Sequence, residues 1–451
     1  MADLLQDAAT RALAYLDGLD SRSVAPSTKA LAALSELAGP FPDRGEGVED
    51  ILAKLDRLGS PATIASAGPR YFGFVTGGSL PVALAANWLA GAWDQNAFST
   101  TSSPLGAALE MACLTWLRDI FGFPDDAGGA FVTGATMANF TALAAARHAV
   151  LARVGWDVEQ DGLFGAPPIT VFVGDEGHAA LLKAVRMLGL GEGRVQRLAV
   201  DDQGAIRADA LPPIKGPTIL CLQAGNVNSG AFDPAAALIP DAQQSGAWVH
   251  VDGAFGIWAM AAPNRAALAA GYELADSLAV DGHKWLNVPY ESGLTLVRDP
   301  GALHAAMSIS AAYLPEAEAR EPYDYTPECS RRMRAVDIWA ALASLGRAGL
   351  AELIETCCRH AAMMAEDLAA AGYEILNDVK LNQVLVSFGG DSLTERIIAG
   401  VQADGTAWCG GTRWHGRAAM RISFSSHATT DGDVGKTLDA ILRVARSNSG
   451  E

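Results

Sequence analysis

The stretch DSLAVDGHKWLNVP, residues 276–289, decides the fold. It opens with an apolar run of strand length that stops at Asp281, where a glycine and polar residues follow. Four other stretches have the same form: PPITVFVGDEGH (167–178), GPTILCLQAGN (216–226), GAWVHVDGAFG (246–256) and SGLTLVRDP (292–300). Short apolar runs separated by helical stretches predict the buried strands of a mostly parallel sheet with helices on both faces, which is an α/β fold.

The chain around this sheet is predicted to divide into three parts. Residues 1–79 alternate helical patterns with proline and glycine breaks and form an N-terminal helical segment. Residues 80–344 form the large domain. Residues 345–451 form a smaller α/β domain, in which a long helix leads to strands near LNQVLVSFGG and AAMRISFSSH.

Composition limits the partners and the compartment. A net charge of −18 with no basic cluster argues against nucleic acid as a partner. The acidic N-terminus lacks the pattern of a secretory signal, and apolar stretches such as 79–93 are too short or too interrupted to span a bilayer. The six cysteines form no C-x-x-C pair, so we expect a protein of the reducing cytoplasm, without membrane association.

Polar residues that suit a bound anion and a planar ring follow two of the expected strands. Gly134 ends the short run GGAFVTG, and Thr136 is expected to cap the alanine-rich helix that follows. A helix N-terminus with a hydroxyl suits a phosphate, although most caps bind nothing. His178 follows the next run and could stack on a planar ring. The alternative for His178 is a histidine hydrogen-bonded within its loop.

A carboxylate and a lysine follow two further strands. Asp252 ends the run WVHVD, where a carboxylate is costly unless it pairs with a cation such as a protonated pyridine nitrogen. The alternative is an aspartate that caps the next element. Lys284 follows His283 among apolar residues, and desolvation makes a lysine an effective imine-forming amine. An anion site, a ring-stacking histidine, an aspartate and a lysine in this order predict a pyridoxal 5′-phosphate site without a metal.

Four motifs carry a resemblance to a known family: HVDGAFG (250–256), DGHKWLNVP (281–289), GNVNSGAFDP (225–234) and CSRRMRAVDIWAALASLG (329–346). Over nearly its whole length the chain resembles the group II pyridoxal-dependent decarboxylases, which include aromatic-amino-acid, histidine, glutamate and diaminobutyrate decarboxylases. The resemblance implies fold-type I, the aspartate-aminotransferase architecture. It also implies a homodimer with shared active sites, whose N-terminal segments pack on the partner.

The resemblance implies decarboxylation of an L-amino acid to its amine and CO2 through an external aldimine and a quinonoid. Lys284 would hold the cofactor as a Schiff base, Asp252 would pair with the ring nitrogen, and His178 would stack on the ring near the substrate carboxylate. The other residues implied at the cofactor contact its phosphate or belong to the loop beside the ring: Ala135, Thr136, His283, Asn226 and Asn228.

The resemblance also implies a proton donor and a substrate pocket. Tyr313 lies in the stretch 308–328, which resembles a catalytic loop that reaches the neighbouring subunit's site. It would protonate the substrate carbon, with Tyr323 and Tyr325 as competing donors. The expected pocket comprises two wall residues and two residues at a position of partner-chain contribution: Phe74, Thr76, Asn96 and Phe98.

Several positions depart from the common pattern of the family. Met137 replaces the usual glutamate of the phosphate loop, and Gly68 stands where a histidine often precedes proline. Asp281 occupies a position often held by asparagine, and we do not assign it to the phosphate. Arg421 could bind a carboxylate or form a structural ion pair. The substrate therefore stays open, as do other fold-type I reactions (aldehyde synthesis, carbon–carbon lysis, transamination) and a catalytically silent homologue.

Overall fold

The computed structural model describes residues 1–309 and 320–449. Its contacts group the chain into two compact units. The large unit comprises residues 77–362 and 377–383, and the small unit comprises residues 1–76, 363–376 and 384–451. The sequence predicts boundaries at 79/80 and 344/345, whereas the contacts divide the chain first after residue 76 and next after residue 362.

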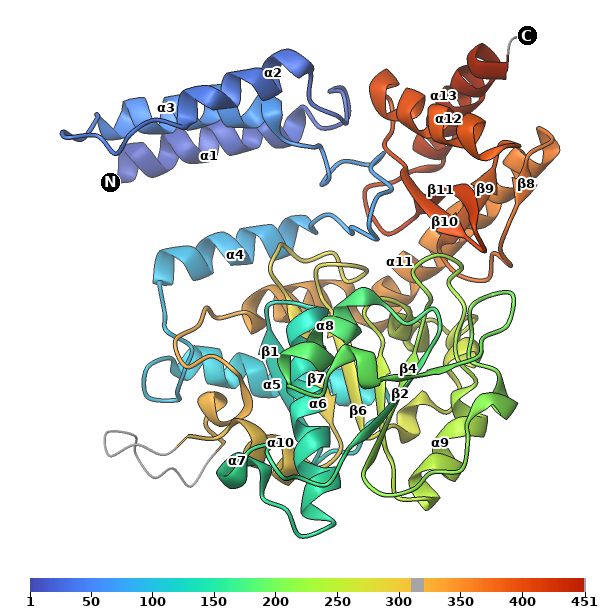
Figure 1. Ribbon diagram of the computed structural model, residues 1–451. Coiled ribbons are helices and arrows are strands. Elements are labelled where there is room, and N and C mark those ends of the chain that lie inside the picture. Colours follow the sequence, from blue (N-terminus) through green and yellow to red (C-terminus); the bar gives the residue numbers. More distant parts are fainter. Residues whose placement is uncertain (310–319, 450–451) are drawn as a thin grey trace. The chain divides into compact units, whose positions relative to one another are not determined.

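The large unit is built on a seven-stranded sheet (Figure 1). Its strands are β1 (Gly128–Val132), β2 (Thr170–Gly174), β3 (Gln196–Leu198), β4 (Thr218–Gln223), β5 (Trp248–Asp252), β6 (Ser277–Asp281) and β7 (Gly293–Val297). They lie in the order β1-β7-β6-β5-β4-β2-β3. β7 pairs antiparallel with both β1 and β6, and the other pairs are parallel. The mostly parallel sheet predicted from the sequence is confirmed.

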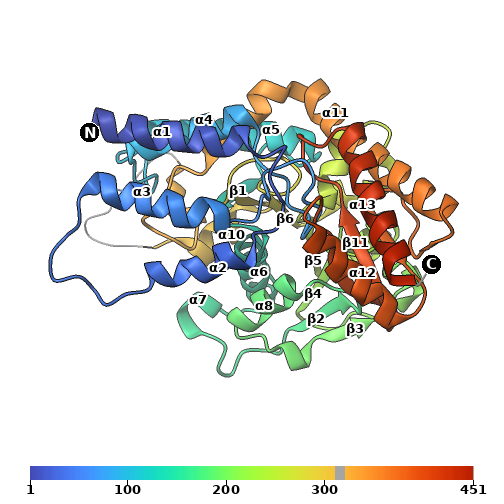
Figure 2. The ribbon, with the colours of Figure 1, turned by 90° about the horizontal axis from the view of Figure 1, so that it is seen from above.

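Helices cover both faces of this sheet. The α-helices of the large unit are α4 (Pro81–Trp93), α5 (Pro104–Ile120), α6 (Ala135–Ala152), α7 (Val158–Asp161), α8 (Ala179–Met187), α9 (Ala235–Gln244), α10 (Pro300–Met307) and the first part of α11 (Ala335–Ala370). Figure 2 shows α6, α8 and α10 on one side of the sheet and α5 and α11 on the other. Short 3-10 helices join these elements at Glu192–Arg194, Ala208–Ala210, Gly256–Ala261, Ala266–Ala269, Tyr272–Leu274 and Pro322–Tyr325.

The core explains why the sequence folds this way. β1, β5, β6 and β7 are buried at every position, as their unbroken apolar runs require. α6 packs on this sheet and buries many small side chains, among them Ala142, Ala145 and Ala146. Small side chains let the helix approach the strands closely. β3 escaped prediction because it has three residues, of which only Leu198 is buried.

The small unit joins the two ends of the chain. It contains α1 (Ala2–Asp17), α2 (Thr28–Ala33), α3 (Val48–Gly59), α12 (Asp391–Asp404), α13 (Asp431–Ser449) and 3-10 helices at Leu34–Leu37 and Ser60–Ala62. A four-stranded sheet has the order β10-β11-β9-β8, from β8 (Glu374–Ile375), β9 (Gln383–Ser387), β10 (Gly410–Trp414) and β11 (Arg417–Ser423). A buried ion pair of 2.8 Å between Arg70 and Asp433 ties the N-terminal segment to α13.

Within residues 1–309 and 320–449, each helix is too short or too polar to serve as a membrane span.

Candidate active site

A cavity of about 300 Å³ lies where polar residues follow strands of the large sheet. Its lining comes from the loop after β1, the start of α8 and the residues that end or follow β5 and β6: Thr133, Gly134, Ala135, Thr136, His178, Ala180, Asp252, Ala254, Asp281, His283 and Lys284. Six residues predicted from the sequence therefore meet around one space. Parallel strands bring this about, because their carboxyl ends share one edge of the sheet.

Lys284 is held by a carboxylate that the sequence left unassigned. Its Nζ lies 3.0 Å from Oδ2 of Asp281, and the lysine side chain is 17% exposed. The other oxygen of Asp281 accepts a hydrogen bond of 2.5 Å from the backbone N–H of Ala135. Asp281 is thus bonded to its neighbours, which is one of the ways to accommodate a carboxylate where the family often has asparagine. It also fixes where the lysine amine lies.

His283 completes this arrangement as a neutral imidazole. Burial lowers its pKa below the ordinary histidine value, although Asp281 opposes that shift. Nδ1 of His283 accepts a hydrogen bond of 3.1 Å from the N–H of Ser292. In the neutral ring the proton therefore sits on Nε2, which lies 3.4 Å from Asp281 Oδ1. His283 can present this N–H to an anion in the cavity.

The start of α6 is the candidate anion site, although its cap differs from the prediction. Thr136 was expected as the N-cap, but the helix begins at Ala135 and Gly134 occupies the cap position without a side-chain bond. A Cβ at Gly134 would lie 2.9 Å from Cε1 of His283 and 3.3 Å from Asp281 Oδ1. Glycine keeps this space open beside a helix N-terminus, which suits a phosphate.

Asp252 is a buried carboxylate for which the described part of the chain supplies no partner cation. It is 4% exposed at the end of β5, and it accepts hydrogen bonds of 3.2 Å from Nδ2 of Asn139 and from the N–H of Ala254. Among the described residues it forms no ion pair. A cation from a ligand would stabilise a buried carboxylate that faces a cavity, and a protonated pyridine nitrogen fits that requirement.

His178 occupies the N-cap of α8. Its Nδ1 accepts a hydrogen bond of 3.1 Å from the N–H of Ala180, which fixes the orientation of the ring. With Nδ1 accepting, the proton of the neutral ring sits on Nε2. This bond is the one expected if His178 is a histidine that is hydrogen-bonded within its loop. Because His178 also lines the cavity, its stacking on a cofactor ring stays a prediction.

Other predicted residues lie outside the cavity lining. Oδ1 of Asn226 accepts hydrogen bonds from the N–H groups of Asn228 and Ser229, at 2.8 and 3.2 Å, so this asparagine shapes its own loop. Asn96 bonds to the motif 329–346, accepting from the N–H of Arg331 at 3.1 Å. Neither Asn228 nor Asn96 belongs to the lining. The roles predicted for these residues stay predictions.

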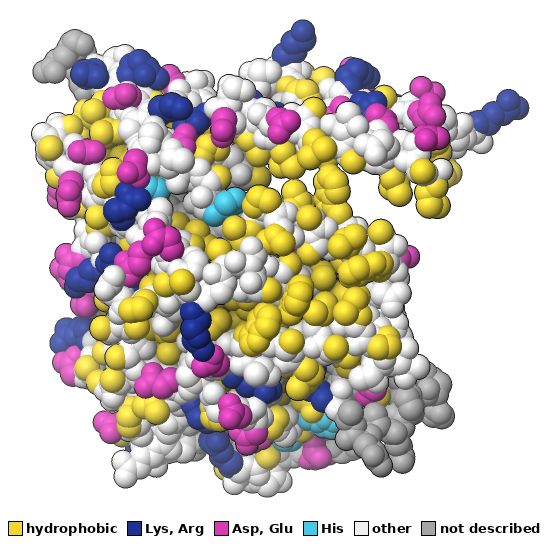
Figure 3. Space-filling view, turned by 180° about the vertical axis from the view of Figure 1, so that it is seen from behind, with side chains coloured by type: hydrophobic (Ala, Val, Ile, Leu, Met, Phe, Trp, Pro, Cys, Tyr) yellow, Lys and Arg dark blue, Asp and Glu magenta, His cyan; other side chains and the backbone are white. Residues whose placement is uncertain are grey.

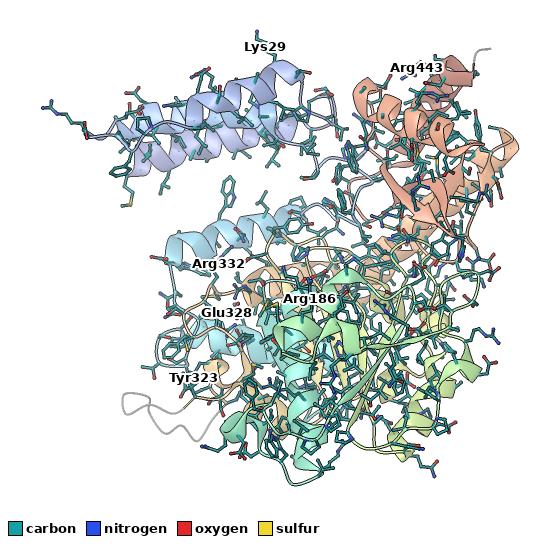
Figure 4. The ribbon with its side chains drawn as sticks, viewed as in Figure 1. Lys29, Arg186, Tyr323, Glu328, Arg332 and Arg443 are labelled. Carbon is teal, nitrogen blue, oxygen red and sulfur yellow. The ribbon has the colours of Figure 1, made fainter. Side chains whose placement is uncertain are left out.

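Aromatic residues of the predicted pocket and loop also lie apart from it. Phe98 stacks on Tyr323 with ring centroids 5.2 Å apart, and Tyr323 lies on Pro322–Tyr325 (Figure 4). Tyr325 packs under the guanidinium of Arg320 at 4.4 Å. Tyr313 falls outside the described residues.

Three predicted residues belong to the small unit: Phe74, Thr76 and Arg421. Phe74 lies 5.5 Å from Trp408 between ring centroids and is largely exposed, whereas Thr76 is buried. Arg421 lies in β11 opposite Gly410, and burial lowers its pKa from the usual arginine value. The pocket and carboxylate-binding roles proposed for these residues stay predictions.

The backbone of Lys284 is positioned by a glycine of the motif PRYFGFVTGGSLP. A Cβ built on Gly77 would lie 1.7 Å from the carbonyl oxygen of Lys284 and 3.0 Å from Nδ2 of Asn287. Two backbone segments therefore touch at this point, and any side chain would separate them. The sequence marks this position only by its two consecutive glycines.

The chain is similar to known proteins over most of its length. Residues 32–389 match the family described as "Pyridoxal-dependent decarboxylase conserved domain". The chain is 28% identical over 369 residues to an aromatic-L-amino-acid decarboxylase of Bacillus atrophaeus, covering 79% of this chain and 74% of the relative. It is 29% identical over 445 residues to an L-2,4-diaminobutyrate decarboxylase of Rhizobium meliloti (strain 1021), covering 93% and 86%.

Solved structures agree on the fold. The crystal structure of Oryza sativa TDC with PLP and tryptamine superposes with a TM-score of 0.90 at 22% identity, covering 99% of this chain and 97% of that one. The fold is therefore fold-type I, as the resemblance implied.

Proposed function

Because the chain belongs to the pyridoxal-dependent decarboxylase family, we propose that it decarboxylates an L-amino acid with Lys284 as the lysine that binds the cofactor. Membership makes the chain a pyridoxal-phosphate-dependent carboxy-lyase acting on an amino acid. The observation that carries the residue assignment is the buried Asp252, which faces the same cavity as Lys284 and has no ion pair among the described residues.

The residues around the cavity fit the parts of the cofactor. Lys284 would hold its aldehyde carbon and Asp252 its ring nitrogen, while His178 would lie against the ring. Ala135, Thr136 and His283 would hold the phosphate at the start of α6. The bound cofactor supplies an electron sink for the pair released when the Cα–carboxylate bond breaks.

The protein contributes charge placement and proton positions. Asp252 supplies a fixed negative charge where a ring nitrogen must keep its proton, and burial strengthens that interaction. Asp281 holds the Lys284 amine at 3.0 Å, so the amine is oriented before the cofactor binds. Nε2 of His178 and Nε2 of His283 each carry a proton when neutral.

A substrate screen tests the proposal. Purified protein loaded with pyridoxal phosphate is incubated with each of the twenty common amino acids and with 2,4-diaminobutyrate, and CO2 is measured. Diaminobutyrate and the aromatic amino acids deserve inclusion because the relatives bear those names. We expect CO2 from at least one of them. The absence of CO2 from every compound would contradict the choice of substrate class.

Gly77→Ala is expected to weaken cofactor binding roughly tenfold or more, because overpacking of this kind costs about 1–3 kcal/mol. The added methyl group cannot fit 1.7 Å from the Lys284 carbonyl, so the lysine backbone must move. Titration with pyridoxal phosphate, followed by absorbance, gives the affinity. Gly435→Ala in α13 is the matched control, because a Cβ there meets no atom within 4 Å. Equal affinity in both variants would show that Lys284 tolerates a shift of its backbone.

We propose that the chain forms a homodimer through the face that carries α4. This helix exposes four large apolar side chains that are 39–53% exposed: Val82, Trp88, Leu89 and Trp93. In the space-filling view of Figure 3, hydrophobic side chains gather on the visible face of the large unit. Such a patch on a soluble chain is typical of an interface.

Leu89→Glu is expected to weaken self-association by roughly tenfold or more, since a charge would enter an apolar interface. Sedimentation velocity over a range of concentrations gives the dissociation constant. Leu274→Glu serves as the control, because Leu274 is 42% exposed on a separate short helix. If the active sites are shared between subunits, turnover falls together with dimer content. A wild-type protein that sediments as a monomer would contradict the proposal.

The cytoplasm is our proposal for its location. All six cysteines are free, and five of them are buried. Burial raises the pKa of Cys357, Cys358 and Cys409 to about 12, so these thiols stay protonated and inert. A reducing compartment suits this set of thiols.

A further inference from the structure

A chain of hydrogen bonds leads from Asp252 into the core of the large unit. Nδ2 of Asn139 donates to Asp252 at 3.2 Å, and Oδ1 of Asn139 lies 2.7 Å from Nε2 of His250. Nδ1 of His250 lies 2.9 Å from Oγ of Ser277, which in turn accepts from Nε1 of Trp248 at 2.9 Å. None of the five side chains is more than 4% exposed, so water cannot replace these bonds.

Local structure brings these residues together. His250 and Asp252 are two residues apart on β5, so their side chains point to the same face of the sheet. Ser277 lies opposite His250 in the register of β5 with β6. Asn139 lies in the second turn of α6, which packs against β5 and β6. All five hydrogen-bonded side chains therefore come from one helix and two strands.

The direction of every hydrogen bond follows from the donors available. The indole of Trp248 can only donate, so Oγ of Ser277 accepts there, and its own hydroxyl proton is available to Nδ1 of His250. At the other end, the anion of Asp252 requires the amide N–H of Asn139, which turns Oδ1 of Asn139 toward His250. Nε2 of His250 must then donate. The bond to Asn139 therefore sets the tautomer of His250, and Ser277 can donate to the nitrogen that is left as an acceptor.

The charge state of His250 agrees with that assignment. Burial lowers the pKa of His250 to about 3, so the ring is neutral near pH 7 and carries one proton, on Nε2. Every donor in this series of hydrogen bonds thus points toward the carboxylate of Asp252. Aligned hydrogen bonds in a dry interior polarise one another, and the result stabilises the negative charge at the end.

We propose that Asn139, His250 and Ser277 are positioning residues that keep Asp252 an anion directed at the ring nitrogen of the cofactor. The inference rests on the proposed function. The residues touch neither substrate nor cofactor and act through Asp252 alone. The sequence offered one overlooked signal, namely a histidine two residues before Asp252 in an otherwise apolar strand.

The test reads the protonation of the ring nitrogen directly. Pyridoxal phosphate labelled with ¹⁵N in the ring is bound to the protein, and the ¹⁵N chemical shift is followed from pH 6 to pH 9. In the wild type we expect the protonated shift throughout. His250→Phe keeps a planar ring of similar size but removes both bonds. We expect the signal to move toward the unprotonated shift, and kcat to fall about tenfold with little change in KM, because the hydrogen bond from Asn139 to Asp252 loses its support.

Two further variants separate positioning from packing. His250→Gln offers a donor and an acceptor at its two ends, and we expect it to restore most of the protonated signal. His360→Phe replaces a buried histidine of α11 that is not one of the five residues, and we expect the ¹⁵N chemical shift of the wild type. Ser277→Ala, a smaller change should His250→Phe fail to fold, is expected to move the shift in the same direction by a smaller amount.

The outcomes distinguish this inference from the proposed function. If the wild type shows the protonated shift and both His250→Phe and Ser277→Ala keep it, the positioning role of Asn139, His250 and Ser277 is overturned. Asp252 would still be the partner of the ring nitrogen. An unprotonated shift in the wild type would overturn the assignment of Asp252 itself, and this inference with it.

Discussion

Lys284→Ala is expected to abolish turnover and to remove the borohydride-reducible bond between chain and cofactor. The amine of Lys284 lies in the cavity lining, held by Asp281 among mostly buried residues. No other lysine belongs to that lining. The measurement is the rate of CO2 release, together with mass spectrometry of peptides after borohydride reduction. The reduced pyridoxyl group should appear on Lys284 in the wild type and on no lysine in the variant.

Two companion variants define what Lys284→Ala removes. Lys284→Arg retains a cation for Asp281 but lacks an amine that forms an imine, so it should fold normally and still be inactive. Lys183→Ala, on the exposed face of α8 close to the site in sequence, should behave as the wild type. A reduced adduct on any lysine other than Lys284 would refute the assignment.

Asp252→Asn is expected to lower kcat roughly 100-fold or more and to weaken cofactor binding, since the ring nitrogen loses a charge-assisted bond in a dry site. Asparagine has nearly the same shape and can still accept from Asn139 at its one side-chain oxygen. The fall in kcat and in cofactor affinity therefore measures mainly the loss of the negative charge. Steady-state kinetics and cofactor titration give the two quantities.

The matched control for Asp252→Asn is Asp175→Asn. Asp175 also follows a strand of the large sheet, but it is exposed and lies outside the cavity lining. We expect wild-type kinetics from it. A kcat near that of the wild type in Asp252→Asn would mean that another group keeps the ring nitrogen protonated.

The sheet was predictable from the sequence because its strands are buried on both faces. Such strands read as short unbroken apolar runs, and glycines and polar residues mark their ends, as at Asp252 and Asp281. The antiparallel direction of β7 was not predictable from its run, because a buried strand reads alike in either direction. The joining of residues 1–76 to the C-terminal part depends on contacts such as Arg70 with Asp433, far apart in sequence.

The site was predictable where position along a strand decides it. His178, Asp252 and Lys284 each follow or end an apolar run, and the parallel sheet brings those ends together. Residues that act through partners were harder to identify. The contact of Asp281 with Lys284 and Ala135 spans α6 and β6, and the place of Asn139 emerges only when α6 packs on β5. The prediction of Thr136 as the helix cap was wrong, because α6 begins at Ala135 and Gly134 occupies the cap position.

Product stoichiometry is the sharpest test of whether an amino acid is decarboxylated at the Lys284 site. With the substrate identified by the screen, CO2, amine, ammonia and hydrogen peroxide are measured from the same reaction. We predict one amine for each CO2, with no ammonia and no peroxide. A carbonyl product with ammonia and peroxide, or an amine formed without CO2, would show that the enzyme does not carry out simple decarboxylation.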